Sequence, residues 1–184
     1  MKGRIYSMDF STLVQERRSI RSYQPSNALS RSTLDEIMKT ALQAPSWKNT
    51  QTGRYYVASS EEMIAHVRSC LPLFNQKSTQ NAVAYLVTTY EKGNSGFTKG
   101  EPDNELGDKW GAYDLGLQNA YLILKAKELG LDSLIMGLRD SDLLRKVFDI
   151  PDTEEVGPVI ALGYREGDAL LRRRKEVEDI TKIY

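Results

Sequence analysis

One stretch, AVAYLVTTY from Ala82 to Tyr90, restricts the fold more than any other part of the chain. It is almost continuously β-prone, which is typical of a strand covered on both faces. The remaining sequence alternates further β-prone runs with segments of helical periodicity. We therefore predict an α/β or α+β architecture around one sheet, and a length of 184 residues favours a single domain spanning residues 1–184.

Hydrophobic periodicity and turn residues place the other elements along the chain. The predicted helices cover residues 10–16, 32–44, 59–71, 108–129 and 141–148, and the predicted strands cover 54–58, 82–90, 132–136 and 157–164. Ser32 with Asp35 and Ser59 with Glu62 have the spacing of capping boxes at two helix starts. The glycine-rich segment 91–107 is predicted to be a long loop, a kind of segment that often serves as a lid or binding loop.

Two features predict an interface with a second chain. The helix at 108–129 has small or apolar residues at 112, 115, 122, 126 and 129 and an asparagine at 119, the spacing of a packed helix seam, and further apolar residues lie on its other faces. The tail 165–184 is highly charged and carries only a small apolar set, so it would dock on its own domain or on a partner chain. We expect a homodimer.

Composition excludes several classes of protein. There are 25 Lys and Arg against 25 Asp and Glu, one His and one Cys. Balanced charge argues against a nucleic-acid-binding coat, and a lone Cys cannot form an intrachain disulfide. The segment MKGRIYSMDF lacks the apolar core of a signal peptide, and the longest apolar run is too short to cross a bilayer. We expect a cytoplasmic protein with neither a membrane nor a nucleic-acid partner.

The sequence lacks the common motifs for nucleotide binding and for catalysis by protein side chains or zinc. It contains no G-x-G-x-x-G after a strand, no P-loop, no G-x-S-x-G elbow and no H-E-x-x-H zinc motif. His66 is predicted to form a surface pair with Glu62, and Cys70 to be a small core residue. We therefore expect no metal site and no catalytic side chain, and any chemistry would come from a cofactor.

Cations gather near the two ends of the chain. Arg17, Arg18 and Arg21 lie in the segment RRSIRSY, and the run RRRK follows at 172–175. Guanidinium groups match phosphate oxygens, so the two clusters would hold a phosphate monoester if they met in space. The alternative is that the first cluster complements a helix dipole and the second is a solvated tail.

Two polar segments are further candidates for ligand contacts. PSWKNTQ at 45–51 surrounds Trp47 with amides and hydroxyls and could hold a planar ligand at its edge, although a polar turn with a buried Trp explains it equally well. FNQK at 74–77 sets an amide beside a cation and is by itself an ordinary loop.

Taken in order, these segments resemble the nitroreductase family of flavin oxidoreductases. The resemblance runs from about residue 10 to residue 183 and rests on RRSIRSY, APSWKNTQ, FNQK, DLGLQNAYLILKAKELGLDS, GPVIALGY and the basic tail. It implies an α+β fold, a three-layer α/β/α sandwich around a mixed central sheet, in a homodimer with intertwined termini. It also implies FMN bound at the subunit interface, NADH or NADPH as electron donor, and a nitroaromatic, quinone or similar small-molecule acceptor.

The resemblance also implies which residues bind the cofactor. They are Arg17, Arg18, Ser19 and Arg21, Pro45, Ser46, Trp47 and Asn49, Asn75 and Lys77, Ile135, Met136 and Gly137, and Arg172 and Arg174. Residues 17–21 would contact the phosphate, the ribityl chain and the flavin edge, and the arginines at 172 and 174 the phosphate. Residues 45–49 would reach the flavin from the other subunit.

Within the same resemblance, Asn75 would read the pyrimidine edge, and Lys77 would lie near flavin N1 and O2. Residues 134–137 would lie near the N5 and dimethylbenzene side of the flavin. The chain departs from the family pattern at Thr52 and Gly53, where Pro-Trp is common, and at Trp47, where a small residue is usual. A flavin-binding storage or sensing protein without turnover, and a flavin-free dimeric interaction protein, are the alternative functions.

Overall fold

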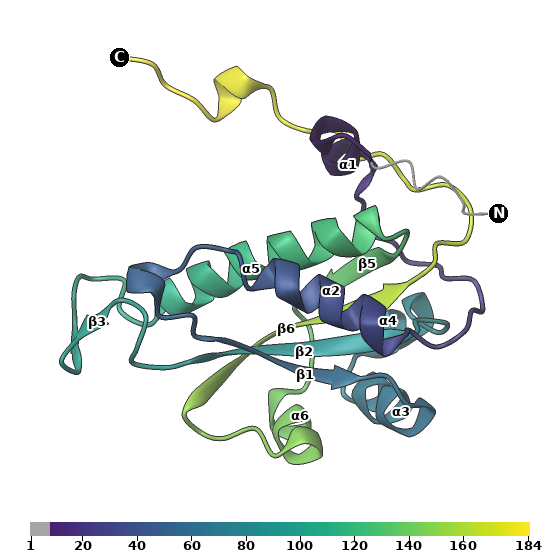
Figure 1. Cartoon of the computed structure of the whole chain (residues 1–184), viewed down its shortest axis with the longest axis horizontal. Coiled ribbons are helices and arrows are strands. Elements are labelled where there is room, and N and C mark those ends of the chain that lie inside the picture. Colours follow the sequence, from purple (N-terminus) through teal and green to yellow (C-terminus); the bar gives the residue numbers. More distant parts are fainter. Residues whose placement is uncertain (1–7) are drawn as a thin grey trace.

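A four-stranded sheet, in the order β1-β2-β6-β5, forms the middle of the molecule (Figure 1). The computed structural model describes residues 8–184; residues 1–7, within the segment predicted to lack a signal peptide, lie outside the described residues. The strands are β1 Gly53–Ala58, β2 Ala84–Glu91, β5 Asp132–Met136 and β6 Glu154–Gly163. Their three pairings are antiparallel, and a parallel bridge between Ser19 and Ser133 at the β5 edge makes the sheet mixed.

The buried strand predicted at 82–90 is confirmed as β2. It is central in the sheet, and its residues Ala84 to Thr89 are all buried. Its side chains alternate between two core clusters: Leu86 packs with Leu122 and Ile160 on one face, whereas Tyr85 and Val87 join the cluster on the other. A strand covered on both faces has no solvent side, which explains its uninterrupted apolar sequence.

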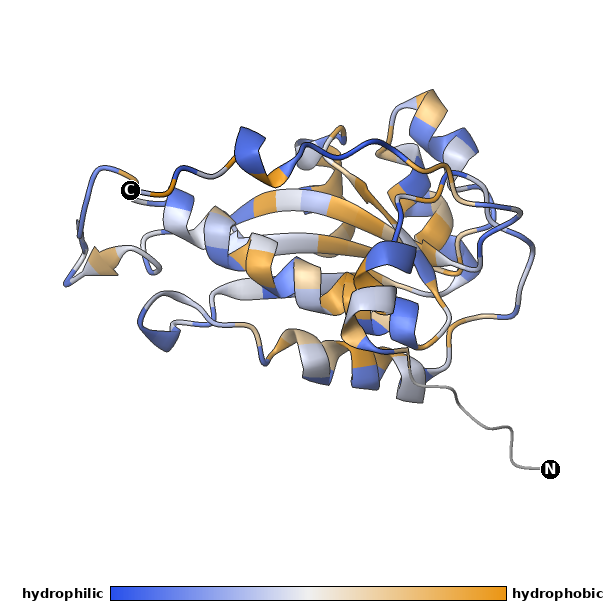
Figure 2. Ribbon diagram, turned by 90° about the horizontal axis from the view of Figure 1, so that it is seen from above, coloured by the Kyte–Doolittle hydropathy of each residue, from blue (hydrophilic) through white to orange (hydrophobic). Residues whose placement is uncertain are grey.

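Helices cover both faces of the sheet and confirm the predicted three-layer α/β/α sandwich. The α-helices are α1 Phe10–Glu16, α2 Arg31–Ala41, α3 Glu61–Ser69, α4 Leu73–Ser78, α5 Lys109–Glu128 and α6 Ser141–Phe148. α2 and α5 lie on one face, and α3 and α6 on the other (Figure 1). Apolar residues gather along the strands and the helix faces beside them (Figure 2). Burying each large apolar side chain there stabilises the fold by roughly 1.5–3 kcal/mol.

Several local predictions require correction. FNQK is not a loop but part of α4, and segment 91–107 contains a hairpin of β3 (Phe97–Thr98) and β4 (Glu101–Pro102). Two helices are capped by neighbouring serines rather than by the predicted ones: Ser30 accepts the Thr33 N–H at 3.1 Å, and Ser60 accepts the Met63 N–H at 3.3 Å. Adjacent hydroxyls offer equivalent caps in sequence, so backbone conformation decided between them.

The predicted seam of α5 packs mostly within its own chain. Its positions 115, 119, 122 and 126 are buried, and α5 makes its most extensive helix contact with α2. Tyr113 and Tyr121 remain exposed on the other face, by 58% and 39%. The tail 170–184 also exposes its apolar residues and, with 3-10 helix η2 (Val177–Asp179), extends away from the sheet (Figure 1). Among residues 8–184, no helix has the length and apolarity to span a membrane.

Two sequence predictions about single residues are confirmed. His66 lies on exposed α3 surface with Nε2 3.9 Å from a Glu62 carboxylate oxygen. Cys70 is buried in the cluster under α3 and α6, and burial raises the pKa of its thiol. Burial and a raised pKa both disfavour the reactive thiolate form of Cys70.

Candidate functional site

The segment RRSIRSY follows α1 and runs in extended form beside the free edge of β5. The Ile20 N–H donates to the Ser133 carbonyl at 3.0 Å, and the Gln24 N–H donates to the Tyr164 carbonyl at 3.0 Å. The Glu166 N–H in turn donates to the Ser22 carbonyl at 3.0 Å. The segment thus lies between β5 and the start of the carboxy-terminal tail, so residues 17–24 and 164–166 lie side by side.

The two arginine clusters consequently lie close to each other. Burial, together with the nearby charges of Arg174 and Arg18, lowers the pKa of Arg17. The Arg18 Nε is buried and has no hydrogen-bond partner among the described residues. Uncompensated, partly buried guanidinium groups are costly without an anion, so this arrangement fits a phosphate group. We name residues 17–21 and 172–174, with the edge of β5, the arginine edge.

A cavity of about 260 Å³ opens at the arginine edge. It is lined by Ser19, Arg21 and Arg172 and, on the tail side, by Glu166, Asp168 and neighbouring residues. Glu166 accepts a hydrogen bond from the Ser22 hydroxyl at 2.7 Å, so one of the two carboxylates is already engaged with a neutral donor. The cavity joins residues that are about 150 positions apart in the sequence, as their proposed shared role requires.

Further along β5, the predicted residues 135–137 occupy an open strand edge. Ile135 is 44% exposed, whereas Met136 is 3% exposed and packs in the core. Because the Ser133 carbonyl faces outward to Ile20, the main-chain groups of Ile135 face the same way two residues later. Met136, one position further, turns its main-chain groups toward Val159 of β6 and its side chain into the core, so it offers neither to a ligand at this edge.

The amide predicted to read a flavin edge lies near the end of this strand. Asn75, on α4, is 8% exposed, and its Nδ2 is 3.5 Å from the Leu138 carbonyl. Lys77 is exposed on the same short helix. Residues 17–21, 75, 135–137 and 172–174 thus all lie around the edge of β5, although they come from four separate parts of the sequence.

Loop 45–53, the segment before β1, lies elsewhere in the chain. It packs against the amino-terminal part of α5, at the other end of that helix from the arginine edge (Figure 1). Pro45, Ser46, Trp47 and Asn49 therefore do not join the other predicted residues within one subunit. This separation agrees with the implied role of the loop in reaching a ligand bound to a second subunit, which stays a prediction.

Internal contacts fix this loop in place. The Trp47 ring lies 4.6 Å from the Trp110 ring between centroids, and the Trp47 N–H donates to Asp114 Oδ2 at 2.9 Å. Lys48 Nζ donates to Thr98 Oγ1 at 2.6 Å and pairs with Asp103 Oδ2 at 2.8 Å. The β3–β4 hairpin thus holds the outer side of the loop, and α5 holds its inner side.

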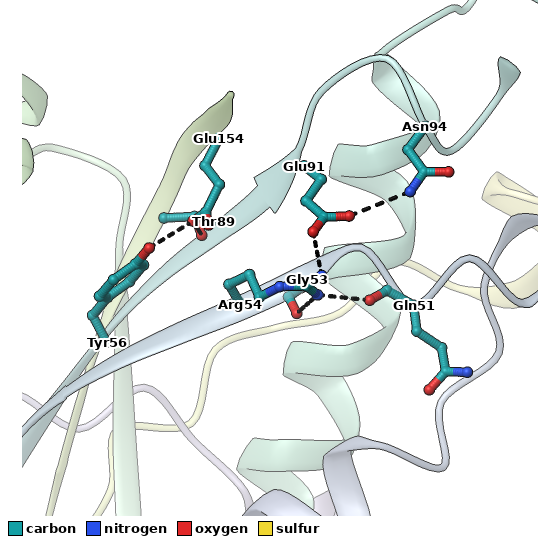
Figure 3. Close-up of polar contacts among 8 residues, drawn as sticks. All are labelled: Gln51, Gly53, Arg54, Tyr56, Thr89, Glu91, Asn94 and Glu154. Atoms are coloured by element: carbon teal, nitrogen blue, oxygen red, sulfur yellow. Dashed lines mark hydrogen bonds and ion pairs between the residues drawn. The ribbon is translucent and has the colours of Figure 1, made fainter. Parts of the chain in front are cut away.

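The end of the loop is fixed by the sheet (Figure 3). Arg54 donates to the carbonyls of Gln51 at 2.8 Å and Gly53 at 2.9 Å, and it forms an ion pair with Glu91 at the end of β2. Asn94 holds the same carboxylate of Glu91 from the following turn, at 3.3 Å. These contacts join the loop to two strands.

Sequence reasoning missed Asp114, Trp110 and Ser95 as supports of the loop. Trp110 and Asp114 are four residues apart on α5, and this i, i+4 spacing was the available signal that they share a face. The structure shows that this carboxylate is 6% exposed, and a buried acceptor of this kind needs donors from its neighbours.

Comparison with known proteins gives a consistent result. The sequence model described as "Nitroreductase family" matches residues 14–164. Protein DrgA of a Synechocystis species is 24% identical over 191 residues, covering 91% of this chain and 89% of that protein. YdgI of Bacillus subtilis, provisionally named an NAD(P)H nitroreductase, is 26% identical and covers 86% and 88%.

Solved structures agree with this assignment at the level of the fold. An FMN complex of a protein from Exiguobacterium sibiricum 255-15 superimposes with a TM-score of 0.84 at 22% identity, covering 96% of this chain and 98% of that one. A nitroreductase family protein from Streptococcus pneumoniae TIGR4 gives 0.81 at 18% identity, covering 96% and 100%. With the family match spanning the sheet and both helical layers, we conclude that this chain belongs to the nitroreductase family.

Proposed function

We propose that the protein is an FMN-dependent NAD(P)H oxidoreductase that reduces nitroaromatic, quinone or similar acceptors. The observation that carries the proposal is the meeting of two arginine clusters at an open strand edge, where no carboxylate of residues 8–184 forms an ion pair with them. None of Arg17, Arg18, Arg21, Arg172 and Arg174 belongs to an ion pair among residues 8–184. A flavin phosphate would supply the missing charge.

The remaining residues along β5 suit the rest of the cofactor. Asn75 would hydrogen-bond the pyrimidine edge, and Lys77 would lie near N1 and O2, where reduced flavin is negative. The outward main-chain groups of Ile135 and the exposed Gly137 would face the N5 side. Bound flavin supplies hydride transfer between nicotinamide and acceptor, so the chain needs to hold and orient the rings rather than provide an acid or base.

The proposal includes a cytoplasmic homodimer in which the loop of each subunit completes the flavin site of the other. The exposed face of α5 and the exposed apolar residues of the tail support it, because isolated chains rarely leave such surfaces uncovered. The name of YdgI and the FMN complex from Exiguobacterium support the choice of cofactor and donor.

An absorbance spectrum of the purified protein, followed by FMN titration of the apoprotein, tests the proposal. We expect a yellow protein, quenching of FMN fluorescence and a rise in Tm on binding. A colourless protein that neither quenches nor gains stability with FMN would refute it. Stopped-flow mixing with NADH and NADPH then separates an enzyme from a flavin-storage protein, because only the former would bleach the flavin band on a turnover timescale.

A further inference from the structure

We propose that Asp114 is a positioning residue for flavin binding: its buried carboxylate holds loop 45–53 in the conformation that meets the cofactor. The inference rests on the proposed function, in which this loop contacts the flavin of the second subunit. Asp114 lies at the middle of a contact network rather than in the arginine edge, so it would act through the loop and not by touching the cofactor.

The first observation is the burial and bonding of the carboxylate. Asp114 is 6% exposed, and its Oδ2 accepts hydrogen bonds from the Trp47 N–H at 2.9 Å and the Ser95 hydroxyl at 2.5 Å. Ser95 is itself 1% exposed. A buried carboxylate bonded by neutral donors is costly unless each bond is made, so the network specifies one geometry.

The second observation is backbone strain directly after the anchored residue. Lys48, Asn49 and Gln51 have φ values of 47°, 58° and 50°, the left-handed region that glycine favours. A side chain with a Cβ is sterically strained in this region, although asparagine tolerates it better. Such strain persists only where surrounding contacts impose it. The Asp114 bond to Trp47 comes immediately before the strained residues and is one of those contacts.

The third observation is that one face of α5 supports the whole loop. The Trp110 ring packs at a tilt against the Trp47 ring, and Asp114 accepts the Trp47 backbone N–H. Gln118, four residues on, fills the space beside Gly53, where a Cβ would lie 1.9 Å from Gln118 Oε1. Asp114 is the central residue of this i, i+4, i+8 series. Its loss would release the loop from the helix at the point where the strain begins.

The test compares Asp114→Ala with two matched variants. Asp114→Asn keeps an oxygen that can accept both hydrogen bonds. Asn119→Ala removes another buried acceptor from the same helix, one that binds the Tyr55 hydroxyl at 3.0 Å and lies outside the loop contacts. Ser95→Ala removes one donor from the network while leaving the carboxylate, which keeps the test valid if Asp114→Ala does not fold.

The first readout is amide hydrogen exchange in the protein without FMN. Asp114→Ala should accelerate exchange across residues 46–51, whereas Asp114→Asn and Asn119→Ala should leave these residues protected. The second readout is FMN affinity, which Asp114→Ala should weaken by roughly ten- to hundredfold because the contacting groups are misplaced. Asp114→Asn and Asn119→Ala should change it by no more than about twofold, and Ser95→Ala should lie between.

Several results would overturn the assignment. Unchanged amide exchange in residues 46–51 and unchanged FMN affinity in Asp114→Ala would show that the loop keeps its conformation without the Asp114 carboxylate. An equal loss in Asn119→Ala would show a general effect of destabilising α5, as would loss of the dimer together with FMN. Failure of the unmodified protein to bind FMN is a different outcome, since it refutes the proposed function before any variant is compared.

Discussion

The arginine edge and loop 45–53 lie at opposite ends of α5 and satisfy their charged groups in opposite ways. At the edge, neither Arg17 nor Arg174 belongs to an ion pair among residues 8–184, and the Arg18 Nε has no hydrogen-bond partner there. At the loop, Lys48 forms an ion pair with Asp103, Arg54 on the following strand forms one with Glu91, and the Trp47 backbone N–H donates to Asp114. In the proposed function a ligand completes the first region, whereas internal contacts already hold the second, so ligand charge should matter at the edge and internal packing at the loop.

The largest effect is expected from removing a cation of the edge. Arg21→Ala or Arg174→Ala should weaken FMN binding by roughly ten- to hundredfold, because a charge-assisted hydrogen bond contributes about 1.5–3 kcal/mol. Riboflavin, which lacks the phosphate, should bind both variants as it binds the unmodified protein. Lys182→Ala, which removes an exposed cation of the tail outside the arginine edge, is the control. Equal losses of affinity for FMN and riboflavin would show that these residues do not bind the phosphate.

The next largest effect is expected from Gly53→Ala, which adds a methyl group inside the loop. This change should lower the stability of the fold rather than the affinity for phosphate. In Gly53→Ala the new Cβ would overlap Gln118 Oε1, which is 1.9 Å from its ideal position. Because Gln118 Oε1 is the end of a flexible side chain that can shift, we expect a loss of about 1 kcal/mol, at the low end for overpacking, in the free energy of unfolding by urea denaturation. The double variant Gly53→Ala with Gln118→Ala should recover part of it, and an unaltered midpoint in the single variant would contradict the packing described here.

Relief of backbone strain should stabilise the loop slightly. Gln51→Gly places glycine at φ 50° and keeps the backbone N–H that donates to Ser46 Oγ at 3.0 Å. Strain relief of about 1–2 kcal/mol is partly offset by the greater freedom of glycine in the unfolded chain, about 0.5–1 kcal/mol. Urea denaturation should therefore show a gain of up to about 1 kcal/mol. A clear loss would mean that the left-handed conformation carries no strain.

The smallest effect concerns pH. Hydrogen bonds from Lys48 and Thr98 lower the pKa of Asp103 below its ordinary value of 3.8. A lowered pKa means that the contribution of this carboxylate to stability is present above the ordinary pKa and disappears as the pH falls through the lowered one. Between about pH 5 and about pH 3, Asp103→Asn should therefore lose slightly less stability than the unmodified protein in parallel urea titrations. Identical pH profiles would show that the hairpin does not hold the loop through this ion pair.

Local sequence patterns predicted the secondary structure well and the contacts poorly. Helices such as α1 and α6 were found with their ends because apolar spacing and capping act within one or two turns. The short helix α4 was missed because six residues carry too little periodicity to separate a helix from a loop. The burial of Met136 follows from strand alternation, which resemblance to a motif does not consider.

By itself, the sequence determined the order of helices and strands around one sheet, and its ordered motifs identified the family, whereas the cofactor and the residues that bind it stay predictions. The helices and strands depend on local periodicity, and the family on several motifs in a fixed order. Only the tertiary structure decided that the arginines near both ends of the chain meet, that loop 45–53 lies away from them, and that Asp114 holds that loop. The first depends on β5 being the edge strand of the sheet, and the other two depend on which face of α5 the loop packs against. Contacts between residues distant in the sequence fix both arrangements.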